Sequence, residues 1–89
     1  MASVAMRING RVQGVFFRAS ARDKATELGV NGFVQNAADG GVYVEAEGNE
    51  EILKEFIAWC KIGPPYAQVM TIVIEKQSEK GYVGFQIRR

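Results

Sequence analysis

The sequence contains no histidine among its 89 residues. This absence excludes a histidine base or nucleophile and any zinc site that uses histidine ligands. The only cysteine is Cys60, so an intrachain disulfide and a thiolate metal cluster are excluded as well. Any chemistry must therefore depend on arginine, lysine, asparagine, carboxylate, hydroxyl or thiol groups, or on the backbone.

The chain also lacks an excess of charge of either sign and any long apolar run. It carries 11 basic and 10 acidic residues, a net charge of +1, which gives no broad positive field for nucleic acids or anionic lipids. Its apolar stretches are too short to span a membrane, and residues 1–7 lack the apolar core of a secretory signal. We therefore expect a cytoplasmic monomer with no nucleic-acid or membrane partner.

Apolar residues are nevertheless abundant, at 47% of the chain, and their spacing predicts one folded domain over residues 1–89. Helical spacing runs from Phe17 to Leu28 before Gly29, and again between an Asn49 cap and Gly63. Strands are expected at 4–8, 31–37, 42–48, 68–75 and 83–87. The order β-α-β-β-α-β with a short fifth strand predicts an α+β ferredoxin-like sandwich, in which two helices cover one face of an antiparallel sheet.

A glycine-containing loop, residues 10–18 (Gly-Arg-Val-Gln-Gly-Val-Phe-Phe-Arg), joins the first strand to the first helix. Gly10 and Gly14 allow the loop to curl so that its amide groups converge. Arg18 falls at the start of the helix, where the helix dipole favours an anion. The loop alone fits two interpretations, a phosphate or carboxylate site and an ordinary connection with a surface arginine.

Asn36 is the second candidate. A right-handed crossover makes the first two strands run the same way, so they end at the same edge of the sheet. Asn36 shares a strand face with Val34, and if Val34 packs toward the helices then Asn36 lies beside the loop, where its amide can bind water. Alternatively, Asn36 only begins the hairpin turn ahead of Asp39-Gly40.

Residues 10–18 resemble the first signature of the acylphosphatase family, and residues 32–36 with Asp39-Gly40 resemble the second. Four further segments are similar to the family, at 28–29, 42–48, 63–67 and 84–88, so the resemblance covers nearly the whole chain. Phe33 stands where family members often carry tryptophan, a difference expected to affect packing more than chemistry.

The resemblance implies an enzyme that hydrolyses small-molecule acyl phosphates to a carboxylate and inorganic phosphate, without a metal or any other cofactor. It implies that Arg18 binds the phosphate and that Asn36 orients the attacking water. The phosphate-binding residues would then be Gln13, Gly14, Val15, Phe16, Phe17 and Arg18. Inorganic phosphate is expected to bind as product or as a competing ligand.

Two alternatives remain open. The chain can be an acylphosphatase-like domain of the kind found in hydrogenase-maturation proteins that handle carbamoyl phosphate, or a non-catalytic ferredoxin-like binding module. RNA-binding modules of this fold need exposed aromatic residues and a basic sheet face. Here Tyr43 is expected to have Glu45 and Glu47 as neighbours, which makes that alternative poor.

Three other residues receive structural rather than catalytic interpretations. Glu45 and Glu47 alternate with Val44 and Ala46, which predicts a solvated sheet face rather than a catalytic or metal-binding carboxylate pair. Cys60 falls on the apolar stripe of the second helix and is predicted to be a small core residue.

Overall fold

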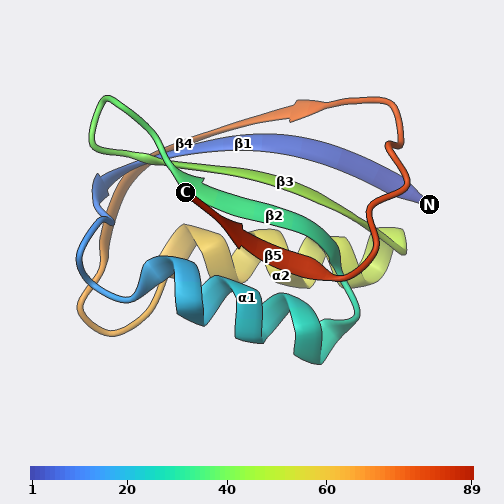
Figure 1. Cartoon of the computed structure of the whole chain (residues 1–89), viewed down its shortest axis with the longest axis horizontal. Coiled ribbons are helices and arrows are strands. Elements are labelled where there is room, and N and C mark those ends of the chain that lie inside the picture. The colour runs from blue at the N-terminus through green and yellow to red at the C-terminus, as the bar shows by residue number, and fades with distance from the viewer.

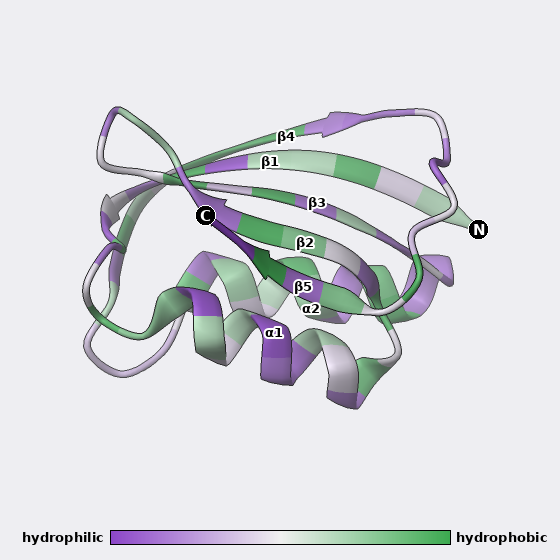
Figure 2. Cartoon of the chain, viewed as in Figure 1, coloured by the Kyte–Doolittle hydropathy of each residue, from purple (hydrophilic) through white to green (hydrophobic).

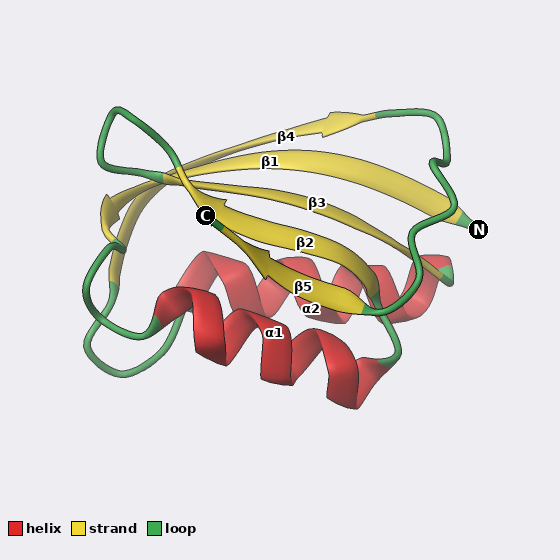
Figure 3. Ribbon diagram, viewed as in Figure 1, coloured by secondary structure: helices red, strands yellow, loops and turns green.

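The computed structural model describes residues 1–89 and contains two helices and five strands (Figure 1). In chain order they are β1 (Ala2–Arg11), α1 (Phe17–Leu28), β2 (Asn31–Asn36), β3 (Val42–Gly48), α2 (Glu50–Ile62), β4 (Gln68–Lys76) and β5 (Phe85–Arg88). Figure 3 shows both helices on the same side of the sheet. This arrangement confirms the predicted α+β ferredoxin-like sandwich. Neither helix is long and apolar enough to cross a membrane.

The strand order in the sheet is β4-β1-β3-β2-β5. The pairs β1–β4, β1–β3 and β2–β3 are antiparallel, as expected, but β5 lies parallel to β2, so the sheet is mixed. The sequence pattern of 83–87 indicated a strand without fixing its direction, which depends on how the preceding connection returns across the sheet. Because β1, β2 and β5 run the same way, their carboxyl ends meet at one edge, on the left in Figure 1.

The core forms between the helices and the inner face of the sheet. Polar and apolar residues are interspersed around both helices and along β3 in Figure 2, as the period of each element requires. The central strands contribute a continuous apolar layer that contains Met6, Ile8, Val34 and Val44, each fully buried. Phe56 of α2 is also fully buried, and its ring lies 5.5 Å from that of Phe85.

The predicted helix boundaries are confirmed by their capping groups. Gly29 ends α1 in a left-handed conformation (φ 81°), and its N–H donates to Ala25 O and Thr26 O. Asn49 begins α2, where its side chain accepts a hydrogen bond from Glu51 N at 2.9 Å.

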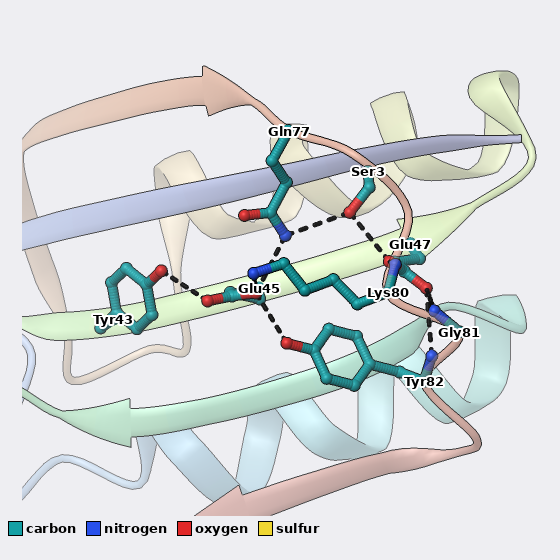
Figure 4. Close-up of polar contacts among 8 residues, drawn as sticks. All are labelled: Ser3, Tyr43, Glu45, Glu47, Gln77, Lys80, Gly81 and Tyr82. Carbon is teal, nitrogen blue, oxygen red and sulfur yellow. Dashed lines mark hydrogen bonds and ion pairs between the residues drawn. The ribbon is translucent and has the colours of Figure 1, made fainter.

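The expectation that Glu45 and Glu47 lie on a solvated face is wrong. They are only 8% and 3% exposed, because residues 77–82 fold over the outer face of the sheet at this point (Figure 4). The covering segment is distant in sequence, so the alternation within β3 contained no sign of it. No group of three or more carboxylate or thiol side chains that could hold a metal ion occurs here or elsewhere.

Each glutamate is instead held by hydrogen-bond donors. Glu47 accepts from Ser3 Oγ (3.0 Å) and from the backbone N–H groups of Lys80, Gly81 (3.1 Å) and Tyr82 (3.2 Å). Burial alone would raise the pKa of Glu47, but these donors outweigh it and lower the pKa. The carboxylate therefore replaces a missing strand partner for three consecutive amides.

Glu45 receives side-chain donors from both sides. It accepts from the hydroxyls of Tyr43 (2.6 Å) and Tyr82 (2.7 Å) and from Gln77 Nε2 (2.9 Å), while Lys80 Nζ lies 3.9 Å away. Burial opposes ionisation, yet these donors lower the pKa of Glu45 overall. Burial, together with the bonds to Glu45, also raises the pKa of each tyrosine to about 12. We call Glu45, Glu47 and the groups that bind them the glutamate cluster.

Candidate active site

The loop between β1 and α1 is curled by two residues with left-handed backbone conformations. Gly14 has φ 73°, and Phe16, directly before the helix, has φ 64°. Val12 is 1% exposed and anchors the loop in the core, while Val15 packs against the same core from the side. Left-handed residues within such a loop favour converging amide groups, a geometry that can bind an anion.

The beginning of α1 differs from that of α2 in a way that favours an anion. In α2 the Asn49 side chain caps an amide, and Glu50 and Glu51 occupy the first turn. In α1 no side chain caps the first turn and no acidic residue occupies it. Arg18 stands there instead, next to the positive end of the helix dipole, which is unfavourable for the helix unless an anion lies nearby.

The first N–H groups of α1 come before the repeating backbone hydrogen bonds of the helix. The earliest hydrogen bond runs from Ser20 N to Phe16 O, at 3.0 Å. The N–H groups of residues 17–19 therefore come before the first repeating helical bond, as at any helix start. N–H groups at a helix start point outward along the helix axis, so an oxyanion bound at this end of α1 can accept hydrogen bonds from them.

Gln13 fastens this loop to the β2–β3 turn. Its Nε2 donates to Ala37 O at 2.9 Å and to Gly41 O at 2.8 Å, so one side chain connects two segments more than 20 residues apart. Gly41 N in turn donates to Asp39 Oδ1 at 2.9 Å, which closes the turn. This bond, followed by one from Asn9, lowers the pKa of Asp39. Asn36 is the last residue of β2, directly before the fastened turn.

Arg18 and Asn36 line the same open cleft, which has a volume of about 670 Å³. The lining residues are Val12, Gly14, Phe16, Phe17, Arg18, Ala19, Asn36, Ile87 and Arg89. Of the phosphate-binding residues expected from the sequence, Gly14, Phe16, Phe17 and Arg18 line the cleft, whereas Gln13 and Val15 do not. Val34, two residues before Asn36 on the same face of β2, packs in the core toward the helices. This was the condition under which Asn36 was expected to lie beside the loop.

Four residues of the lining were not among the sequence candidates: Val12 and Ala19, which adjoin candidates in the chain, and Ile87 and Arg89, which are distant from them. No local signal in the sequence connected Ile87 or Arg89 to the loop. The missing information was the direction of β5: because it runs parallel to β2, its carboxyl end emerges beside Asn36. With Arg18 and Arg89 and no acidic residue in its lining, the cleft is electropositive.

Arg18 forms no ion pair, whereas Arg22, one turn later, contacts Asp23 Oδ1 at 3.3 Å. The sole thiol, Cys60, is fully buried outside the cleft, and its burial raises its pKa, which keeps it protonated. The polar side chains that line the cleft are therefore Arg18, Asn36 and Arg89.

Comparison with known proteins agrees with this picture. The family model of acylphosphatases matches residues 4–87. An acylphosphatase of Methylococcus capsulatus is 44% identical over 90 aligned positions, which cover 100% of this chain and 98% of that protein. The crystal structure of acylphosphatase from Bacillus subtilis matches with a TM-score of 0.96 at 34% identity, over 100% of both chains.

A larger protein also contains a similar unit. The structure of full-length HypF in the phosphate- and nucleotide-bound form matches with a TM-score of 0.91 at 31% identity. The match covers 99% of this chain but 12% of HypF.

Proposed function

Because the chain belongs to the acylphosphatase family and is an enzyme that hydrolyses acyl phosphates, we propose that Arg18 and Asn36 are its catalytic pair. Arg18 and the amides of residues 13–17 bind the phosphoryl group, and Asn36 holds the attacking water. The observation that carries the proposal is the shared cleft, lined by Arg18 from α1 and by Asn36 from β2.

The chemistry of acyl phosphates suits this small set of groups. The leaving group is a carboxylate, which departs as a stable anion and needs no general acid. Phosphoryl transfer has a loose transition state, so catalysis depends mainly on positioning and on stabilising charge on the phosphoryl oxygens. A guanidinium fork and several converging amides can supply that stabilisation without a metal ion.

Asn36 would contribute position rather than basicity. A carboxamide both accepts and donates hydrogen bonds, so it can hold a water in line with the bond that breaks. Holding the water converts a bimolecular encounter into a nearly unimolecular one. The substrate phosphate can accept the proton of the water, which agrees with the lack of histidine in the chain.

The test is hydrolysis of benzoyl phosphate in the presence of EDTA, with inorganic phosphate as competitor. Arg18→Ala should lower kcat by about 10²–10³, the usual effect of losing one preorganised donor, and should weaken inhibition by phosphate. Asn36→Ala should remove turnover but leave phosphate inhibition nearly unchanged. Matched controls are Arg22→Ala, on the same helix, and Gln35→Ala, next to Asn36 in β2; both residues lie outside the cleft lining.

Near-normal turnover in Asn36→Ala would refute its role in holding water. Loss of activity on chelation would refute the metal-free mechanism. Equal losses in Arg18→Ala and Arg22→Ala would show that general surface charge, rather than a phosphate contact, is responsible.

The similarity to HypF favours one further candidate, an acylphosphatase-like unit that acts on carbamoyl phosphate within a longer protein. Comparing kcat/KM for carbamoyl, acetyl and benzoyl phosphate separates the two candidates. A strong preference for carbamoyl phosphate would favour the second one.

A further inference from the structure

Phe16 is unusual in its conformation and in its exposure. Its φ of 64° lies in the left-handed region, where glycine is common but bulky residues are rarely found. Its side chain is 75% exposed and does not belong to the hydrophobic core. The ring thus stabilises neither the local backbone nor the packing of the fold.

The position of the ring gives it another use. Phe16 lines the cleft that contains Arg18 and Asn36. The cleft volume of about 670 Å³ is in the range of sites that enclose a whole small organic molecule, roughly 300–1,000 Å³. A phosphoryl group fills only part of such a volume, so space remains for the rest of the substrate.

The lining also contains two kinds of side chain. Arg18, Asn36 and Arg89 supply polar groups, whereas Phe16, Ala19 and Ile87 supply apolar surface. An acyl phosphate likewise has two parts, a charged phosphoryl group and an acyl group that can be apolar. With the phosphoryl group on the loop amides, the acyl group extends into the part of the cleft that the apolar residues line.

We propose that the ring of Phe16 forms one wall of an acyl-group subsite, and that this subsite favours acyl phosphates with an aromatic or extended apolar acyl group over acetyl phosphate. The inference rests on the proposed function of the cleft. A benzoyl group is large enough to contact the ring, and aromatic pairs gain attraction beyond simple area burial. The single methyl group of acetyl phosphate offers far less surface.

The measurement is the ratio of kcat/KM for benzoyl phosphate to kcat/KM for acetyl phosphate. In Phe16→Gly this ratio should fall by roughly threefold to tenfold, the range that one aromatic contact provides. The ratio cancels any change in the shared phosphoryl step, including one caused by the altered backbone, and inhibition by inorganic phosphate reports on that step separately. Glycine adopts φ 64° freely, so the variant should fold.

Two further variants complete the test. Phe16→Tyr keeps the ring and should retain the ratio. Tyr66→Ala removes an aromatic side chain that is equally exposed, at 76%, but lies outside the cleft lining, and it should leave the ratio and the activity unchanged.

A ratio that stays constant in Phe16→Gly would overturn the acyl subsite. It would leave the proposed function intact, because the ratio reports on the acyl group and not on the roles of Arg18 and Asn36. A ratio that falls as far in Phe16→Tyr or in Tyr66→Ala would overturn the acyl subsite too. Failure of the unaltered chain to hydrolyse either substrate would instead refute the proposed function, and the subsite with it.

Discussion

Replacing Glu47 by glutamine should destabilise the fold strongly, in a manner that depends on pH. The two carboxylate oxygens of Glu47 each accept two hydrogen bonds: Oε2 from Ser3 Oγ and Lys80 N, and Oε1 from Gly81 N and Tyr82 N. In Glu47→Gln one oxygen becomes an NH₂ group, which cannot accept. The hydroxyl of Ser3 can rotate to accept from the new group, but at least one backbone N–H loses its partner.

The magnitude follows from these contacts. An unpaired buried donor costs about 1–3 kcal/mol, and hydrogen bonds to a charged group are worth roughly 0.5–1.5 kcal/mol more than those to a neutral one. We therefore expect Glu47→Gln to lower the free energy of unfolding by about 2–4 kcal/mol. Glu47 is 3% exposed, so solvent screening reduces this effect little. For a chain of this length, the Tm should fall by roughly 10–25 °C.

The sign of the pH dependence is fixed by the direction of the pKa shift. The pKa of Glu47 in the folded state is lowered from 4.5, chiefly because its donors outweigh the effect of burial. The stabilisation is therefore complete above the pKa of the unfolded chain and is lost as the pH falls below about 4.5 through the folded pKa. Glutamine does not titrate, so the difference between the two proteins should be constant near neutrality and shrink in acid.

Urea denaturation of both proteins between pH 7 and pH 3 provides the measurement. Glu55→Gln is the matched control, because Glu55 is an exposed residue of α2; it should change stability by less than about 0.5 kcal/mol. A Glu47→Gln effect as small as that of the control would refute the reasoning, as would a large effect that stays constant down to pH 3. The folded variant should retain the KM for benzoyl phosphate, because Glu47 lies outside the cleft.

Two more predictions concern Gln13 and Cys60. Gln13→Ala should reduce the free energy of unfolding by about 1–3 kcal/mol, because the carbonyls of Ala37 and Gly41 lose their shared donor. It should also lower kcat for benzoyl phosphate, because Asn36 is then held less firmly. Urea denaturation and steady-state kinetics measure the two effects, and an unchanged kcat would contradict the positioning role of Gln13. Cys60 should react with iodoacetamide slowly in the folded protein and promptly in denaturant, because burial raises the pKa of its thiol; equal rates, followed by mass spectrometry, would contradict its placement in the core.

The parts of the fold that the sequence predicted are those with local causes. The apolar period of α1 and the cap at Gly29 are encoded within a few residues, and the structure places both as expected. The same holds for Asn49, whose capping bond reaches only two residues along the chain. The strand alternation of 42–48 correctly identified the inner face, where Val44 and Ala46 are fully buried.

The features that the sequence did not predict depend on segments far apart in the chain. The sequence pattern predicted that Glu45 and Glu47 are exposed to solvent, because residues 77–82, which cover them, follow some 30 positions later in the chain. Phe16 gave no sign of its left-handed backbone, since the local sequence contains glycines that would adopt that conformation more readily. The inclusion of Arg89 in the cleft required the direction of β5, which periodicity does not contain.

The connection from β4 to β5, which covers the glutamates, and the loop between β1 and α1, which lines the cleft, lie at opposite ends of the sheet, on the right and the left of Figure 1 respectively. The glutamate cluster holds the segment that leads into β5, and the cleft begins where β5 ends, next to Asn36 and the loop that precedes α1. A chain segment held at its beginning and paired along β2 has little freedom at its end, because the parallel pairing of residues 85–88 fixes its register. Strong disruption of the cluster should therefore affect the cleft only through loss of β5. Since Ile87 belongs to β5 and Arg89 directly follows it, such a partial opening should weaken substrate binding before it removes the phosphate contacts of Arg18, which belong to α1.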